Sequence, residues 1–115
     1  MPAIVAAVAP GARVIVFGHL AEGNLHVNVL DAGDRDSEVT DAVLRAVVAR
    51  GGSISAEHGV GRAKVEWLGL SRTPAEVAVM TAVKRALDPT WMLAPGVLLP
   101  APTNLAHKPA DKPAD

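Results

Sequence analysis

A turn-forming segment between two β-rich runs is the feature that most restricts how this chain can fold. The first run, at about 12–19, is rich in β-branched residues, and the second, at about 25–31, alternates apolar and polar residues. Gly23 and Asn24 in the connection tolerate the positive φ angles that tight turns require. The pattern predicts a β-hairpin whose polar groups are surrounded by apolar residues, so they are not simply a solvated face.

Two histidines lie on this predicted hairpin. Residues two apart in a strand share a face, so His26 and Asn28 point the same way. His19 ends the first strand, and the turn folds the chain back so that His19 comes near His26. Imidazole and carboxamide groups that converge in an apolar setting indicate a divalent-metal site or acid–base chemistry.

A second polar stretch follows a predicted helix. The segment 38–50 has apolar residues at helical spacing, and the glycines after it stop the helix. Residues 53–56 are expected to form a short strand, and Glu57 and His58 to lie in a glycine-flanked loop that can approach a ligand closely. Glu57 and the two hairpin imidazoles suit Zn²⁺, Mn²⁺ or Fe²⁺. Spacing alone leaves open the alternative of hydrogen-bonded histidines beside a turn.

The remaining patterns predict helices. Residues 2–9 are expected to end a helix, and 62–70 to form a short one. Thr73 and Glu76 form a capping box that opens a helix running to about Leu87. The expected fold class is α+β, with a small, mostly antiparallel sheet and helices packed on one of its faces.

Three finer expectations accompany these helices. Asp36 or Ser37 is expected to cap the helix that follows it. Lys64 and Lys84 are interpreted as solvated helix residues. The buried face of the last helix is expected to consist of Val77, Met80, Val83 and Ala86 or Leu87.

Composition narrows the possible functions of this 115-residue chain, which is long enough for one small domain. Half of the residues are hydrophobic but only 3% are aromatic, so the core must be built from aliphatic side chains. A formal net charge of −1 without a basic cluster provides no electrostatic basis for nucleic-acid binding. The absence of cysteine excludes thiolate ligands, disulfides and a cysteine nucleophile.

The sequence divides into a domain and a C-terminal tail. No apolar run approaches the roughly 20 residues of a membrane helix, and the apolar start lacks the basic region of a signal peptide, so the expected localisation is cytoplasmic. The domain is expected to span 1–99. Residues 100–115 repeat Lys-Pro-Ala-Asp and are expected to be disordered, and His107 within them is assigned no role.

Three motifs, at 18–28, 51–61 and 86–96, resemble the C-terminal part of the FAD-linked oxidases and dehydrogenases that act on D-2-hydroxy acids. This family includes the D-lactate dehydrogenases, the D-2-hydroxyglutarate dehydrogenases and the FAD subunit of glycolate oxidase. The chain departs from the family pattern at Ala21 and Glu22, where Gly and Asp are usual, and at Ala94, where Asn is usual. The lost asparagine removes a polar contact near the flavin.

The resemblance implies roles for the site residues. His19, His26 and Glu57 match the positions at which metal-dependent members bind their ion, here expected to be Zn²⁺ or Mn²⁺. Glu22 either orients one of these histidines or is a solvated turn residue.

The resemblance also implies a substrate and a flavin. The Asn28 amide would bind the substrate's carboxylate or hydroxyl, the alternative being a strand residue bonded to a neighbouring loop. The position of His58 corresponds to the proposed general base for the C2 hydroxyl, and His58 and Gly59 lie beside the FAD. The alternative for His58 is a loop histidine bonded to backbone.

Family members are several times longer and bind FAD in an N-terminal domain. No glycine-rich dinucleotide fingerprint occurs in this sequence, so the FAD phosphates would lie on another polypeptide or an absent domain. We therefore expect exposed apolar surface and either an FAD-domain partner chain or self-association.

The first functional hypothesis is the substrate- and metal-site portion of an FAD-dependent D-2-hydroxy-acid oxidoreductase. A non-enzymatic remnant, acting at most as a metal-binding or interaction module, is the second, and a metal hydrolase is a weaker third.

Overall fold

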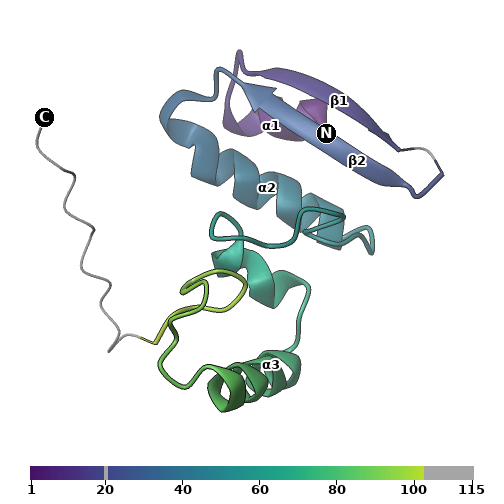
Figure 1. Ribbon diagram of the computed structural model, residues 1–115. Coiled ribbons are helices and arrows are strands. Elements are labelled where there is room, and N and C mark those ends of the chain that lie inside the picture. Colours follow the sequence, from purple (N-terminus) through teal and green to yellow (C-terminus); the bar gives the residue numbers. More distant parts are fainter. Residues whose placement is uncertain (20, 103–115) are drawn as a thin grey trace, which may run out of the picture.

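Figure 1 shows the computed structural model of the chain, which describes residues 1–19 and 21–102. In chain order its elements are α1 (Pro2–Val8), β1 (Arg13–His19), β2 (Asn24–Leu30), the 3₁₀ turn η1 (Gly33–Arg35), α2 (Asp36–Val48), the 3₁₀ helix η2 (Val65–Leu70) and α3 (Pro74–Leu87). The predicted disordered tail lies outside the described residues from 103 onward, and His107 lies there with it.

The predicted hairpin is confirmed to within about one residue at each strand end. β1 and β2 pair antiparallel from Arg13 opposite Leu30 to His19 opposite Asn24. Val14 and Val29 lie directly opposite each other on one face and pack against α1 and α2. No helix of the described residues covers the other face in Figure 1. The α+β prediction, with a small antiparallel sheet and helices on one face, is therefore confirmed.

Within the described residues, the core consists of three small clusters rather than one. The buried residues are Val5, Ala9, Ala32 and Val39 in the first cluster, Leu44, Ile54 and Trp67 in the second, and Leu68, Trp91 and Leu99 in the third. In Figure 1 the hairpin and α3 lie at opposite ends, with α2 between them. Val60 packs against both the second and the third cluster, so the segment between α2 and η2 is attached to both.

One hydrogen bond joins α2 to η2, and a second one within α2 holds the same carboxylate. The Trp67 indole Nε1–H donates to Asp41 Oδ1 at 2.9 Å, and Arg45 Nε donates to Asp41 Oδ2 at 2.7 Å. These two bonds, the one from Arg45 above all, lower the pKa of Asp41. The segment 49–64, which contains the second polar stretch, is thus bounded by two elements that are linked to each other.

Two local predictions are wrong. Neither Asp36 nor Ser37 caps α2, because η1 already turns the chain and leaves Arg35 at the N-cap without a side-chain bond. Residues 53–56 form bends and no strand in the described part of the chain. The Ser53 hydroxyl accepts from the Ser55 N–H at 3.2 Å and donates to the Ser55 carbonyl at 3.0 Å, which closes a turn.

The capping box of α3 is confirmed, but the predicted buried face is only half right. Thr73 Oγ1 accepts from the Glu76 N–H at 3.2 Å, and the Thr73 N–H donates to Glu76 Oε2 at 2.7 Å, which lowers the pKa of Glu76. Val77 and Met80 pack against the third cluster, whereas the Leu87 side chain is 80% exposed. The third cluster contacts Val77 and Met80 in the first half of α3, whereas in the second half it is Lys84 that lies beside Trp91 of this cluster. Val83 and Ala86 are exposed there with Leu87.

The interpretation of Lys84 as a solvated residue is also wrong. Lys84 Nζ pairs with the buried carboxylate of Asp88, donates to the Leu93 carbonyl at 2.6 Å and lies 5.6 Å from the centre of the Trp91 ring. Asp88 Oδ2 also accepts from the Leu93 N–H at 2.9 Å, and Asp88 Oδ1 accepts from the Met92 N–H at 3.0 Å. The Lys84 bond is the main reason why the pKa of Asp88 is lowered. This pair shapes the loop that follows α3.

Apolar surface is exposed, as the sequence leads one to expect. Ile15 and Phe17 lie on the bare face of the hairpin, and the Phe17 side chain is 53% exposed. Val79 on α3 and Met92 in the following loop are exposed at the other end of the molecule.

Ala94 adopts a backbone conformation that favours glycine or asparagine. Its φ angle is 44°, in the left-handed region that costs a residue with a Cβ about 1–2 kcal/mol. Ala94→Gly is therefore expected to raise the free energy of unfolding by about 0.5–1 kcal/mol in urea titrations, since the larger entropy of unfolded glycine offsets part of the gain. The control is Ala78→Gly at an exposed position of α3, for which the expected change has the opposite sign: the free energy of unfolding should fall by about 1 kcal/mol. Equal losses in both variants would contradict a strained Ala94.

Candidate metal and substrate site

Three histidines converge on one carboxylate beside the hairpin tip. Glu57 Oε1 lies 2.7 Å from His26 Nε2, 3.7 Å from His19 Nε2 and 3.7 Å from His58 Nε2. The His26 ring centre is 5.6 Å from that of His19 and 6.0 Å from that of His58. His26 is central and its side chain is only 22% exposed, whereas His58 lies outermost at 82%. The structure thus brings together the four residues to which the sequence assigned metal and acid–base chemistry.

The hairpin positions two of these histidines. Phe17 faces His26 across the strands, and the two rings stack with centres 4.8 Å apart and an interplanar angle of 11°. Gly18 allows the strands to approach beside His19, because a Cβ there would lie 2.0 Å from the carbonyl oxygen of Asn24. The stacking role of Phe17 escaped sequence reasoning, although the hairpin register implied it.

A loop attached at both ends presents Glu57 and His58. The Ile54 side chain is buried in the second cluster, and the Gly61 carbonyl accepts from the Leu98 N–H at 3.4 Å. Gly59 has a φ of 72°, and a Cβ built there would meet no atom within 4 Å, so the backbone beside His58 is open to a ligand.

The donor set fits a divalent ion. The ligand atoms of His19, His26 and Glu57 all lie within 4.8 Å of one another. A tetrahedral ion with bonds of about 2.0–2.2 Å holds its ligand atoms about 3.4 Å apart, so the observed separations lie on both sides of this value. Small side-chain rotations would bring the three groups to ligand distance.

Two further candidate residues lie near this cluster. Asn28 is exposed and follows His26 by two residues, so both share the bare face of the hairpin. No protein hydrogen bond to its side chain occurs within the described residues, so the alternative of a loop-bonded Asn28 finds no support. Glu22 makes no ion pair with His19 or His26 in the described part of the chain, which favours its interpretation as a solvated turn residue.

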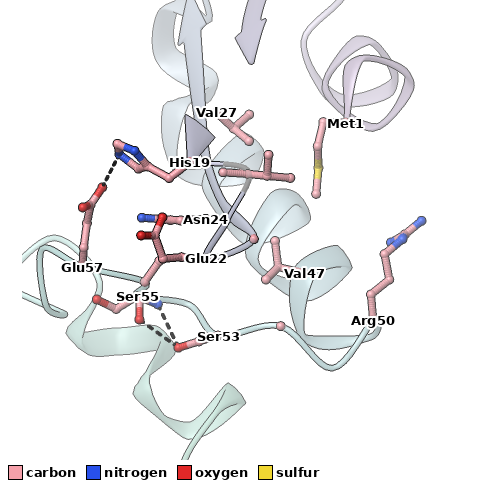
Figure 2. A pocket seen from close by; sticks show the side chains of 14 residues that line it. Met1, His19, Glu22, Asn24, Val27, Val47, Arg50, Ser53, Ser55 and Glu57 are labelled. Carbon is pink, nitrogen blue, oxygen red and sulfur yellow. Dashed lines mark hydrogen bonds and ion pairs between the residues drawn. The ribbon is translucent and has the colours of Figure 1, made fainter. Parts of the chain in front are cut away.

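A cavity of about 920 Å³ lies behind the hairpin tip. Figure 2 shows Val27 and Val47 at its apolar wall, with His19 and Glu57 on one side and Arg50 on the other. Val27 belongs to the hairpin face opposite to that of His26 and Asn28, and neither of those two lines the cavity. A ligand that touches His26, Asn28 and His58 together would therefore lie on the open face and not in this cavity.

Within the described residues, no helix has both the length and the apolar character that a membrane span requires.

Fold and site together define an α+β domain that presents a cluster of imidazoles and one carboxylate beside a hairpin tip. Residues 3–98 match the family model of the FAD linked oxidases, C-terminal domain, and the chain belongs to this family. The resemblance inferred from the three motifs is thereby confirmed.

Several curated proteins are similar to this chain. It is 43% identical over 100 residues to a D-2-hydroxyglutarate dehydrogenase of Stutzerimonas stutzeri, covering 80% of this chain and 22% of that protein. It is 41% identical over 107 residues to a D-2-hydroxyglutarate dehydrogenase of Xanthomonas citri pv. viticola, and the match covers 84% of this chain and 23% of that protein. It is 37% identical over 91 residues to a D-lactate dehydrogenase of Anaerostipes hadrus, and the match covers 73% of this chain and 19% of that protein. The chain therefore spans less than a quarter of the length of these relatives. No solved structure matches it significantly.

Proposed function

We propose that this chain is the C-terminal substrate- and metal-site portion of an FAD-dependent oxidoreductase that oxidises a D-2-hydroxy acid by hydride transfer to flavin. The observation that carries this proposal is the convergence of His19, His26 and His58 on Glu57, in a chain whose relatives are named D-2-hydroxyglutarate and D-lactate dehydrogenases. The FAD domain would lie on another segment or on a partner chain.

In this proposal His19, His26 and Glu57 hold a Zn²⁺ or Mn²⁺ ion. Such an ion would supply a Lewis acid that polarises a substrate oxygen. The protein's own contribution is orientation: Phe17 stacks on His26 and limits the rotation of its ring, and the strand end places His19 beside it. The carboxylate is the single negative charge among the three groups, so it contributes most of the attraction for a cation.

His58 is the proposed general base and Asn28 the substrate-binding residue. The exposed imidazole of His58 takes the proton of the C2 hydroxyl as the C2–H bond breaks, and the product is a 2-oxo acid. An imidazole suits this role because its ordinary pKa lies near 6.5. The Asn28 amide, on the same face as His26, donates to the substrate carboxylate. Gly59, whose backbone is open to a ligand, would border the flavin, which when bound would supply the hydride acceptor.

The identity of the 2-hydroxy acid and the cytoplasmic localisation stay predictions. D-2-Hydroxyglutarate and D-lactate are the first substrates to test, since these are the acids in the relatives' names. Glycolate is the next substrate to test, and only the family resemblance of the sequence suggests it.

A second candidate is a remnant without dehydrogenase activity that binds at most a metal ion or a partner. One observation favours it: Ala94 occupies a left-handed position at which the family pattern has asparagine.

The two candidates differ in whether a flavin accompanies the chain. The tagged full chain is to be purified from its own cells and its flavin absorbance recorded anaerobically before and after addition of D-2-hydroxyglutarate or D-lactate. For the dehydrogenase portion we expect a stoichiometric flavin-bearing partner whose absorbance bleaches with a D-acid and not with its L-enantiomer. A colourless, partnerless chain would favour the remnant.

A further inference from the structure

We infer that Lys64 is a positioning residue for the loop that carries Glu57. Its ammonium group holds the backbone carbonyl of Ile54 and thereby places the Glu57 carboxylate within reach of His19 and His26. This inference rests on the proposed metal site, whose occupancy it would tune.

The bond between Lys64 and Ile54 links the loop to the helix that follows it. Lys64 Nζ donates to the Ile54 carbonyl oxygen at 3.0 Å, and the bond is partly buried. The Ile54 side chain is 3% exposed and packs with Leu44 and Trp67 in the second cluster. Ile54 is therefore held twice, by apolar packing and by a charge-assisted hydrogen bond, three residues before Glu57.

The rest of the loop offers no comparable attachment before Glu57. Ser53 bonds only within its own turn, to Ser55. In the described part of the chain, residues 56–59 make no backbone hydrogen bond, and the next attachment is the side chain of Val60, which packs against the second and third clusters. The position of Glu57 along this span therefore depends on where Ile54 and Val60 are held, and Lys64 acts on the Ile54 end.

Lys64 differs from a lysine that only packs. Its donor is directed at one neutral carbonyl beside the site loop, and no ion pair to it occurs among the described residues. An apolar side chain of similar length would fill the same space without holding that carbonyl. A change at Lys64 should therefore move Glu57 and weaken metal binding more than it unfolds the chain.

The test compares Lys64→Met with Lys64→Arg in the full chain, by chelator competition with Zn²⁺ and with Mn²⁺. We expect Lys64→Met to weaken metal affinity by about 10- to 100-fold, the range typical of residues that orient a ligand, and Lys64→Arg to restore it to within about threefold of wild type. Arg62→Met is the matched control, because Arg62 is exposed two residues earlier. It should leave affinity unchanged.

Each other outcome is also decisive. Wild-type affinity in Lys64→Met, or a Lys64→Arg variant no better than Lys64→Met, would overturn the inference. If the wild-type chain binds neither ion, the proposed metal site is wrong, and the NMR chemical shifts of the amides at 55–58 decide the positioning role. Amide shifts that move in Lys64→Met but not in Arg62→Met support that role, and unchanged shifts refute it. If Lys64→Met does not fold, Lys64→Gln replaces it under the same criteria.

Discussion

Replacing Glu57 with glutamine is expected to lower the affinity of the chain for Zn²⁺ or Mn²⁺ by more than about 100-fold, beyond the range typical of residues that only orient a ligand. Glu57 Oε1 lies within 3.7 Å of the Nε2 atom of each of the three histidines, and its carboxylate carries the only negative charge among the proposed ligands. Glutamine keeps the length and shape of the side chain but removes that charge. Chelator competition on the full chain gives the affinity directly.

The matched control for this change is Glu22→Gln. Glu22 is exposed in the hairpin turn and pairs with neither His19 nor His26 in the described part of the chain, so its replacement should alter metal affinity by less than about twofold. Once a flavin-bearing partner is in hand, Glu57→Gln and His26→Ala should both abolish turnover. Equal affinities in Glu57→Gln and Glu22→Gln, or unchanged turnover in both site variants, would refute the metal site.

Asp88→Asn is expected to lower the melting temperature of the chain by about 10 °C at pH 7. The substitution leaves the ammonium of Lys84, which is largely buried, without its carboxylate, and breaking a buried ion pair costs several times what a surface pair contributes. It also weakens the bonds that Asp88 accepts from the N–H groups of Met92 and Leu93. Thermal melts followed by circular dichroism measure the effect, with Asp34→Asn in exposed η1 as the control.

The same pair predicts a pH dependence of stability. The Lys84 hydrogen bond lowers the pKa of folded Asp88 below the value of about 3.9 that it has in the unfolded chain. A lowered carboxyl pKa contributes stability above the unfolded pKa, and this contribution is lost as the pH falls through the folded pKa. The difference in melting temperature between wild type and Asp88→Asn should therefore be constant from pH 7 to about pH 5 and shrink below about pH 4. A difference that is the same at pH 3 as at pH 7 would contradict this account.

Asp88 also gives a physical meaning to the third sequence motif. The sequence identifies Asp88 and the proline after it as a helix end, and α3 does end there. In the structure the Asp88 carboxylate additionally accepts two backbone N–H groups of the following loop, in which Trp91 and Ala94 both have positive φ angles. The loop conformation therefore depends on a buried acid that the sequence marks only as a stop signal.

The local features of this fold followed from the sequence because their causes are local. Alternating residues and a turn with Gly23 specify the hairpin, and the capping box of Thr73 and Glu76 specifies the start of α3. The convergence of His19 with His26 follows from hairpin geometry alone. The approach of Glu57 came from the motif resemblance, since nothing in its spacing from the hairpin fixes a distance.

The features that only the tertiary structure could determine depend on which surfaces meet in the folded chain. Helical periodicity places Val77 and Leu87 on one face of α3, but the third cluster reaches only the first, so Leu87 is exposed. Lys64 and Lys84 look like solvated residues in the sequence, yet Lys64 donates to the Ile54 carbonyl and Lys84 to the Leu93 carbonyl, which loops of the folded chain bring near. The sequence by itself determined the hairpin, the helices and the chemical groups of the site, because these depend on neighbouring residues. Packing between distant segments determined which of those groups are buried and where Glu57 lies.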